Sequence, residues 1–234
     1  LGYEKYECDS AVEAIIINGE RSNFADGESE AAVILDKTVF YGESGGQVGD
    51  TGTLKFSNGV FEVETTSKTA DGHYLHIGRL ISGESISVGD IAHAQINVPV
   101  REATMRNHTG AHLLQAALRE VLGTHVEQAG QLVNPDACRF DFTHFSALTA
   151  EELQKVESRV NEVILEGIPV STCEMPLEEA KKLGNQRVFN LIVLGMAASH
   201  MDFTKEQWIK VIEKTVPPKT VDINLRAFEA GYAA

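Results

Sequence analysis

The stretch that decides the fold is PVREATMRNHTGAHLLQAALREVLG, residues 99–123. From Arg101 to Leu122 its apolar residues recur at helical spacing, and Gly123 follows as a C-terminal cap. Short strand-like runs precede Pro99, whereas helices alternate with strands after it. We therefore expect an α+β fold in which this long helix opens a second subdomain.

The predicted helix has two chemically different faces. At about 100° per residue, four polar side chains fall within roughly 40° of one direction. They are His108, His112, Gln115 and Arg119. The residues that we expect to face the core on the opposite side are Gly110, Leu113, Leu114, Ala117 and Val121.

Residues 1–98 contain 13 of the 20 glycines and predict a β-barrel-like subdomain. The expected strands are Val12–Ile17, Ala32–Leu35, Val60–Thr66, Tyr74–Ile77 and Ile91–Val98. Between them stand turn signals such as Asn18-Gly19. The loop YGESGGQVGD, residues 41–50, is either a tight turn at a barrel corner or a place where the backbone approaches a ligand closely.

Residues 99–183 predict an α/β two-layer subdomain, and residues 184–234 a helical tail. After the long helix we expect strands at Thr124–Gln128, Cys138–Phe142 and Val170–Cys173, and a short helix at Leu177–Lys182. Another helix begins at Thr149, which forms a capping-box pattern with Glu152, and ends at Gly167. The expected tail helices are Asn190–Ser199, Thr204–Lys214 and Val221–Ala230, with a break at Pro217-Pro218.

Composition excludes several classes of protein. Apolar residues make up 43% and charged residues 23%, which is ordinary for a chain that buries a core. No apolar run is long enough to cross a membrane, and the net charge of −14 disfavours a broad phosphate-binding surface. Cys8, Cys138 and Cys173 are too few for a disulfide framework and fit a reducing cytoplasm. The chain begins with Leu1 and carries no secretory pattern, so we expect a segment of a longer protein.

His108 and His112 stand four residues apart, a spacing that can chelate one zinc ion. Such pairs also occur on solvated helix faces, so the spacing alone leaves both interpretations open.

The wider sequence is more specific. Residues 106–118, RNHTGAHLLQAAL, resemble the zinc-site helix of the alanyl-tRNA synthetase editing domain and its freestanding relatives. Three further stretches are similar to this family in order and spacing: residues 40–50, FYGESGGQVGD; residues 123–130, GTHVEQAG; and residues 139–145, RFDFTHF. The likeness covers about residues 1–183.

This resemblance implies hydrolysis of an ester that joins a wrong amino acid, serine or glycine, to the acceptor end of tRNA(Ala). It implies that His108 and His112 bind Zn²⁺, which would polarise a carbonyl or a water molecule. It also places Gln128 in the pocket as a catalytic residue. The residues that it implies for substrate binding are Gly45, Gly46, Gln47, Thr109, Ala111 and Gln128.

Two departures from the family pattern predict an impaired activity. The family supplies two more zinc ligands from a later Cys-x-x-x-His motif, which this sequence lacks. Ala111 stands where the full synthetases often carry threonine, so recognition of the serine hydroxyl should be loose.

Beyond Gly184 the sequence resembles the C-terminal segment of the small subunit of 2-oxoacid:ferredoxin oxidoreductases. The stretches that carry this resemblance are GNQRVFN (184–190), VPPK (216–219) and NLRAFEAGY (224–232). The chain is therefore interpreted as a composite of an editing domain and a foreign tail. Two alternatives to an editing hydrolase stay open: a non-catalytic module that binds the tRNA acceptor end, and an assembly piece of an oxidoreductase.

The other histidines carry weaker signals. His73, His76 and His93 are expected on the barrel surface. His125 and His144 either border the pocket or have a structural role.

Overall fold

The structure is a computed structural model that describes residue 2, residues 4–169 and residues 177–233. It divides into two compact units, Leu1–Ile168 and Pro169–Ala234. The second unit begins before Gly184, where the sequence pattern changes. The strand predicted at Val170–Cys173 lies outside the described residues.

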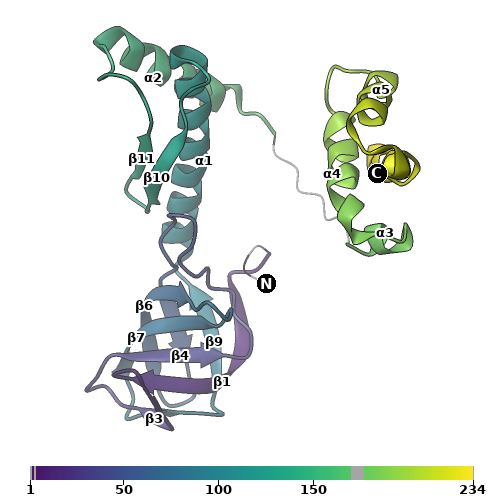
Figure 1. The fold of residues 1–234 in the computed structure, drawn as a ribbon. Coiled ribbons are helices and arrows are strands. Elements are labelled where there is room, and N and C mark those ends of the chain that lie inside the picture. The colour runs from purple at the N-terminus through teal and green to yellow at the C-terminus, as the bar shows by residue number, and fades with distance from the viewer. Residues whose placement is uncertain (1, 3, 170–176, 234) are drawn as a thin grey trace. The chain divides into compact units, whose positions relative to one another are not determined.

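The first unit begins with a closed sheet, which confirms the predicted barrel-like architecture. Its strands are Glu7–Ile17 (β1), Glu20–Ser22 (β2), Ala31–Leu35 (β4), Gly52–Lys55 (β5), Val60–Lys68 (β6), Tyr74–Ser82 (β7) and Ile91–Ile96 (β9). Their order is β2-β1-β4-β7-β6-β5-β9, and β1 also pairs with β9 (Figure 1). A separate pair, Phe24–Ala25 (β3) and Ile86–Ser87 (β8), lies beside it. Asn18-Gly19 turns β1 into β2 with both φ angles positive, as a two-residue hairpin requires.

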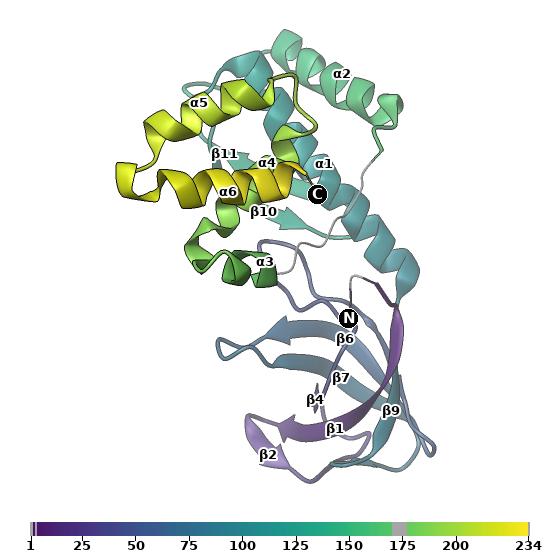
Figure 2. The same ribbon diagram turned by 90° about the vertical axis from the view of Figure 1, so that its right-hand side faces the viewer.

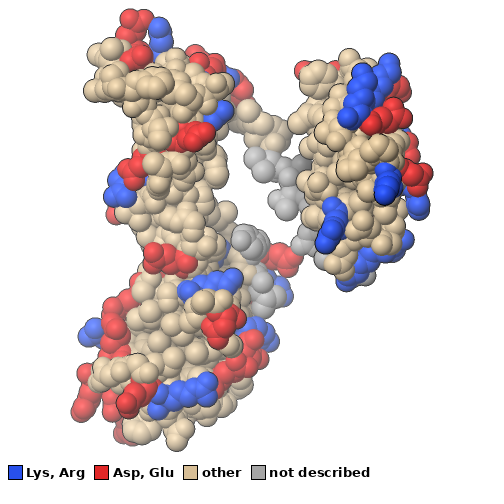
Figure 3. Space-filling model, in the orientation of Figure 1, with Lys and Arg blue, Asp and Glu red and all other residues tan. Residues whose placement is uncertain are grey.

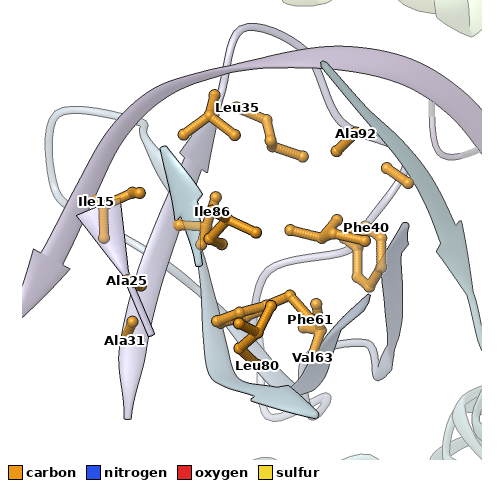
Figure 4. Packing of buried hydrophobic residues seen from close by; sticks show 14 of the residues in the cluster. Ile15, Ala25, Ala31, Leu35, Phe40, Phe61, Val63, Leu80, Ile86 and Ala92 are labelled. Carbon is orange, nitrogen blue, oxygen red and sulfur yellow. The ribbon is translucent and has the colours of Figure 1, made fainter. Parts of the chain in front are cut away.

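Alternating residues of these strands fill the barrel (Figure 4). Ile15, Val33, Leu54 and Phe61 are fully buried there. His76 is fully buried as well, so its predicted surface position was wrong. Its Nδ1 donates to the carbonyl oxygen of Val33, and its Nε2 therefore accepts from the hydroxyl of Thr38, each at 2.8 Å. Because both nitrogens are satisfied, the ring can point inward.

The long helix α1 runs from Val98 to Leu122 and leads out of β9 (Figure 2). It starts three residues before the predicted Arg101, because Asn97 caps it and Pro99 occupies its first turn. Gly123 ends it at a φ of 116°, and its amide donates to the carbonyl oxygen of Arg119. Ala117 and Leu118 are buried, and Leu114 and Val121 pack against them.

Gln128–Val133 (β10) and Cys138–Phe142 (β11) form a hairpin that packs on α1, and Ala150–Glu166 (α2) packs on the same core. Thr149 and Glu152 form the predicted capping box of α2. The strand predicted at Thr124–Gln128 was wrong except for its last residue. Residues 124–127 form a turn and an irregular stretch, because the Val126 amide bonds to Gly123 and its carbonyl accepts from Arg119.

The second unit is helical, as predicted. Its helices are Leu177–Lys182 (α3), Gln186–Val188 (η1), Phe189–Ala198 (α4), Lys205–Thr215 (α5), Pro218–Thr220 (η2) and Val221–Tyr232 (α6). Gly195 and Gly231 let α4 and α6 approach closely, since a Cβ on Gly231 would lie 1.8 Å from the carbonyl oxygen of Ile192. Thr204 and Gln207 form a capping box at the start of α5.

Acidic side chains gather over the barrel on the face shown in Figure 3, while the second unit carries many Lys and Arg residues there. Among the described residues, no helix is both long and apolar enough to cross a membrane.

Candidate active site

Two imidazoles lie one turn apart on α1. The ring centroids of His108 and His112 are 5.1 Å apart, and the ring planes differ by only 9°. Their nitrogen atoms therefore belong to one face of the helix, in the spacing that the sequence predicts.

Gln47 holds the first of these rings. Its Oε1 lies 2.6 Å from Nδ1 of His108, and Gln47 is 6% exposed. Because a carbonyl oxygen only accepts, this assignment puts the ring proton on Nδ1 and leaves the lone pair on Nε2. Burial, together with repulsion from His112, lowers the pKa of His108 below its usual 6.5. The ring is thus held neutral at pH 7, the state that a metal ligand or a proton acceptor needs.

The glycine-rich loop brings Gln47 to this place by docking on β10. The amide of Val133 donates to the carbonyl oxygen of Gly46 at 2.7 Å, and Val48 donates back to Val133 at 3.0 Å. Gly46 has a φ of +79°, and a Cβ there would lie 2.5 Å from the carbonyl oxygen of Gln131. Gly46 therefore allows the backbone of the loop to approach the backbone of β10 closely, so the loop is more than a tight turn at a barrel corner.

A buried ion pair fixes the end of the same loop to the start of α1. Nε of Arg101 donates to both carboxylate oxygens of Asp50, at 2.8 and 3.0 Å, and both side chains are almost fully buried. The guanidinium also donates to the carbonyl oxygens of Gly2 and Val39. Removing one partner of such a pair leaves an uncompensated buried charge. Sequence reasoning missed both residues, because no local pattern links positions 51 residues apart.

The remaining predicted residues lie at different distances from the histidine pair. Thr109 is exposed and donates to the carbonyl oxygen of Met105, whereas Ala111 is 1% exposed. The carbonyl oxygen of Gly45 accepts from the side chain of Gln131. Gln128 is exposed at the opposite end of β10 from Val133, about 16 Å away along an extended strand. The structure therefore joins Gln47 to His108 and leaves Gln128 exposed at the start of β10.

Metal-binding groups are incomplete in the described part of the chain. There, no group of three or more His, Cys, Asp or Glu side chains could hold an ion. Cys173 lies outside the described residues. A cavity of about 660 Å³ lies at the start of the loop, against Tyr41, Gly42 and Lys68, and the histidine pair does not line it.

Two family models match the chain, each over a different part of it. Residues 1–100 match the family model described as tRNA synthetases class II (A). Residues 160–234 match a different one, described as pyruvate ferredoxin/flavodoxin oxidoreductase. The two resemblances predicted from the sequence, one over its first part and one over its tail, are thereby confirmed, and the second match begins at residue 160, before Gly184.

The particular relatives are alanine–tRNA ligases. Those of Acetivibrio thermocellus and Thermus thermophilus are each 48% identical to this chain over 189 residues, and that of Fervidobacterium nodosum is 46% identical over 190 residues. These matches cover 81% of the chain and 21–22% of each relative. The chain thus spans about a fifth of the length of the curated relatives that it matches.

Proposed function

We propose that residues 1–168 act as an aminoacyl-ester hydrolase of the alanyl-tRNA editing type, removing serine or glycine from the acceptor end of tRNA(Ala). The observation that carries this proposal is the hydrogen bond from His108 to Gln47. It couples the glycine-rich loop to a neutral imidazole whose Nε2 keeps its lone pair, one turn from a second imidazole. The similarity to alanine–tRNA ligases supplies the substrate class.

The histidine pair fits Zn²⁺ in donor type but not in number. His108 and His112 would hold the ion, whereas a catalytic zinc normally has three protein ligands. When bound, zinc would polarise the ester carbonyl or a water molecule. Gln47 of this chain keeps the proton on Nδ1 of His108, which leaves the lone pair of Nε2 available. We therefore expect weak zinc binding and slow deacylation, with further ligands coming from outside the described residues or from another chain.

Zinc content tests the assignment of the pair. We expect the purified chain to lose its residual zinc when both His108→Ala and His112→Ala are introduced. His93→Ala, on a barrel histidine that pairs with Asp9, serves as the matched control and should leave zinc unchanged. Unchanged zinc in the double variant would move the metal site elsewhere.

Deacylation tests the activity. We expect seryl-tRNA(Ala) to be hydrolysed faster when residues 184–234 are replaced by a segment bearing Cys-x-x-x-His. Equal rates would contradict the idea that missing ligands limit this chain.

A non-catalytic module that binds the tRNA acceptor end is the second candidate. The incomplete ligand set among the described residues favours it. A chain that binds tRNA without zinc, and without hydrolysis after the replacement, would establish this alternative. The third candidate, an oxidoreductase assembly piece, is supported by the match of residues 160–234 and predicts co-purification with a thiamine-dependent partner.

A further inference from the structure

Three rings gather at the end of the β10–β11 hairpin: His125, His144 and Phe145, here called the aromatic cluster. The centroids of His125 and Phe145 lie 4.5 Å apart, with planes inclined by 24°. Those of His125 and His144 lie 5.1 Å apart at 23°. Phe145 is 86% exposed, so the cluster presents a large apolar ring to solvent.

Hydrogen bonds outside the strand ladder hold these rings in place. Nε2 of His125 and Nδ1 of His144 lie 2.9 Å apart, so one ring donates to the other. The Thr143 amide donates to the carbonyl oxygen of Glu127 at 3.0 Å, and the Glu127 amide donates to the Thr143 hydroxyl at 3.1 Å. The cluster is thus an extension of the hairpin beyond Gln128 and Phe142, which pair in β10 and β11.

The charges nearby decide which part of a nucleic acid the cluster suits. Glu127 is exposed beside it, and the carboxylate of Glu152 interacts electrostatically with His144. Two carboxylates disfavour a phosphate group. A nucleobase, in contrast, stacks on an aromatic ring without requiring positive charge.

We infer that the aromatic cluster is a stacking site for one unpaired nucleobase of the RNA's single-stranded acceptor end, with Phe145 as the stacking residue. The inference rests on the proposed function for its partner, the tRNA. The cluster lies next to Gln128 at one end of the hairpin. At the other end of the same hairpin, Val133 bonds to the glycine-rich loop that holds Gln47. A single strand lying along the hairpin would therefore place one base on Phe145 and its 3′ end toward His108.

Binding of an uncharged acceptor-stem minihelix with its single-stranded 3′ overhang tests the inference. Fluorescence anisotropy should show affinity about tenfold or more weaker for Phe145→Ala and retained for Phe145→Trp. Phe24→Ala is the matched control, because Phe24 is another exposed phenylalanine, 52% exposed on the barrel. It should bind like the unaltered chain. Equal affinity of Phe145→Ala, or no binding by the unaltered chain, would overturn the inference.

A set of minihelices with one abasic position each identifies the stacked base. With the minihelix that lacks the stacked base, Phe145→Ala should cause no further loss of affinity. With each of the other abasic minihelices, the substitution should cause its full loss of affinity. An equal cost at every position would overturn base stacking in favour of a structural effect.

Hydrolysis of a small serine ester separates this inference from the proposed function. Phe145→Ala should leave that reaction unchanged, since a small ester carries no base. If neither the unaltered chain nor the chain with the replaced tail hydrolyses any ester, while minihelix binding still depends on Phe145, the hydrolase proposal fails and the stacking site stands.

Discussion

At the scale of single residues, His76 links a buried imidazole to stability in acid. Burial lowers its pKa from 6.5 to about 4, so the folded chain binds this proton only at a lower pH than the unfolded chain does. The contribution of the neutral, buried ring to the free energy of unfolding is complete above about pH 6.5 and is lost as the pH falls toward 4. We expect a loss of about 3 kcal/mol across this range.

Denaturant unfolding between pH 7 and pH 4 measures that slope. His76→Gln should be less stable at neutral pH and should show a shallower pH dependence. His73→Gln, on an exposed barrel histidine, should retain the original slope. An identical slope for His76→Gln would mean that other groups control the acid response.

Gln47 is the residue on which the orientation of His108 depends. Outer hydrogen-bond partners of a ligating histidine typically contribute 10- to 100-fold to metal affinity. We expect Gln47→Leu to weaken Zn²⁺ binding by a factor of that order, as measured by competition with a chelating dye. Gln115→Leu, on the same helix, should have little effect. Equal losses in both variants would indicate a general effect on α1.

At the scale of elements, the docking of the glycine-rich loop on β10 can be broken at one position. Gly46→Ala places a Cβ against the backbone of Gln131 and keeps an unfavourable positive φ. Gly45→Ala is the matched variant, because its φ is +58° but nothing lies within 4 Å of the added atom. We expect a cost of about 1 kcal/mol for Gly45→Ala and a clearly larger one for Gly46→Ala.

Amide hydrogen exchange reports this docking directly. The amides of Val48 and Val133 bond across the contact, so both should exchange faster in Gly46→Ala than in Gly45→Ala. Equal protection in the two variants would contradict a steric role for Gly46.

The same elements show what the sequence could and could not predict. Helical periodicity placed His108 and His112 on one face, because that relation depends on four residues of local backbone. The Gln47–His108 contact joins positions 61 residues apart, and the Asp50–Arg101 pair joins positions 51 apart. Neither of these two contacts leaves a pattern in the local sequence. The prediction for His76 failed for a different reason. The residue alternates regularly with Gly78 and Leu80 toward the interior, but its polar side chain hides that pattern, and its partners Val33 and Thr38 lie 43 and 38 residues away.

At the scale of the whole molecule, two different family models match parts of one chain, and each of the two compact units has its own core. One cluster centred on Val33 and Phe61 fills the barrel, and another around Ala198, Ile212 and Phe228 belongs to the second unit. Units with separate cores are expected to unfold in separate transitions.

The chain offers a probe for each of these transitions. Trp208, its only tryptophan, packs on the core of the second unit, so its fluorescence reports that unit alone. Exchange of the β1 and β9 amides reports the barrel. Gly231→Ala forces a Cβ into the carbonyl oxygen of Ile192, so it should lower the Trp208 midpoint in urea and leave barrel protection unchanged. Gly46→Ala should leave the Trp208 midpoint unchanged. If each variant changed both the Trp208 midpoint and the amide protection of the barrel, the two units would unfold as one cooperative body, and the prediction of separate transitions would be wrong.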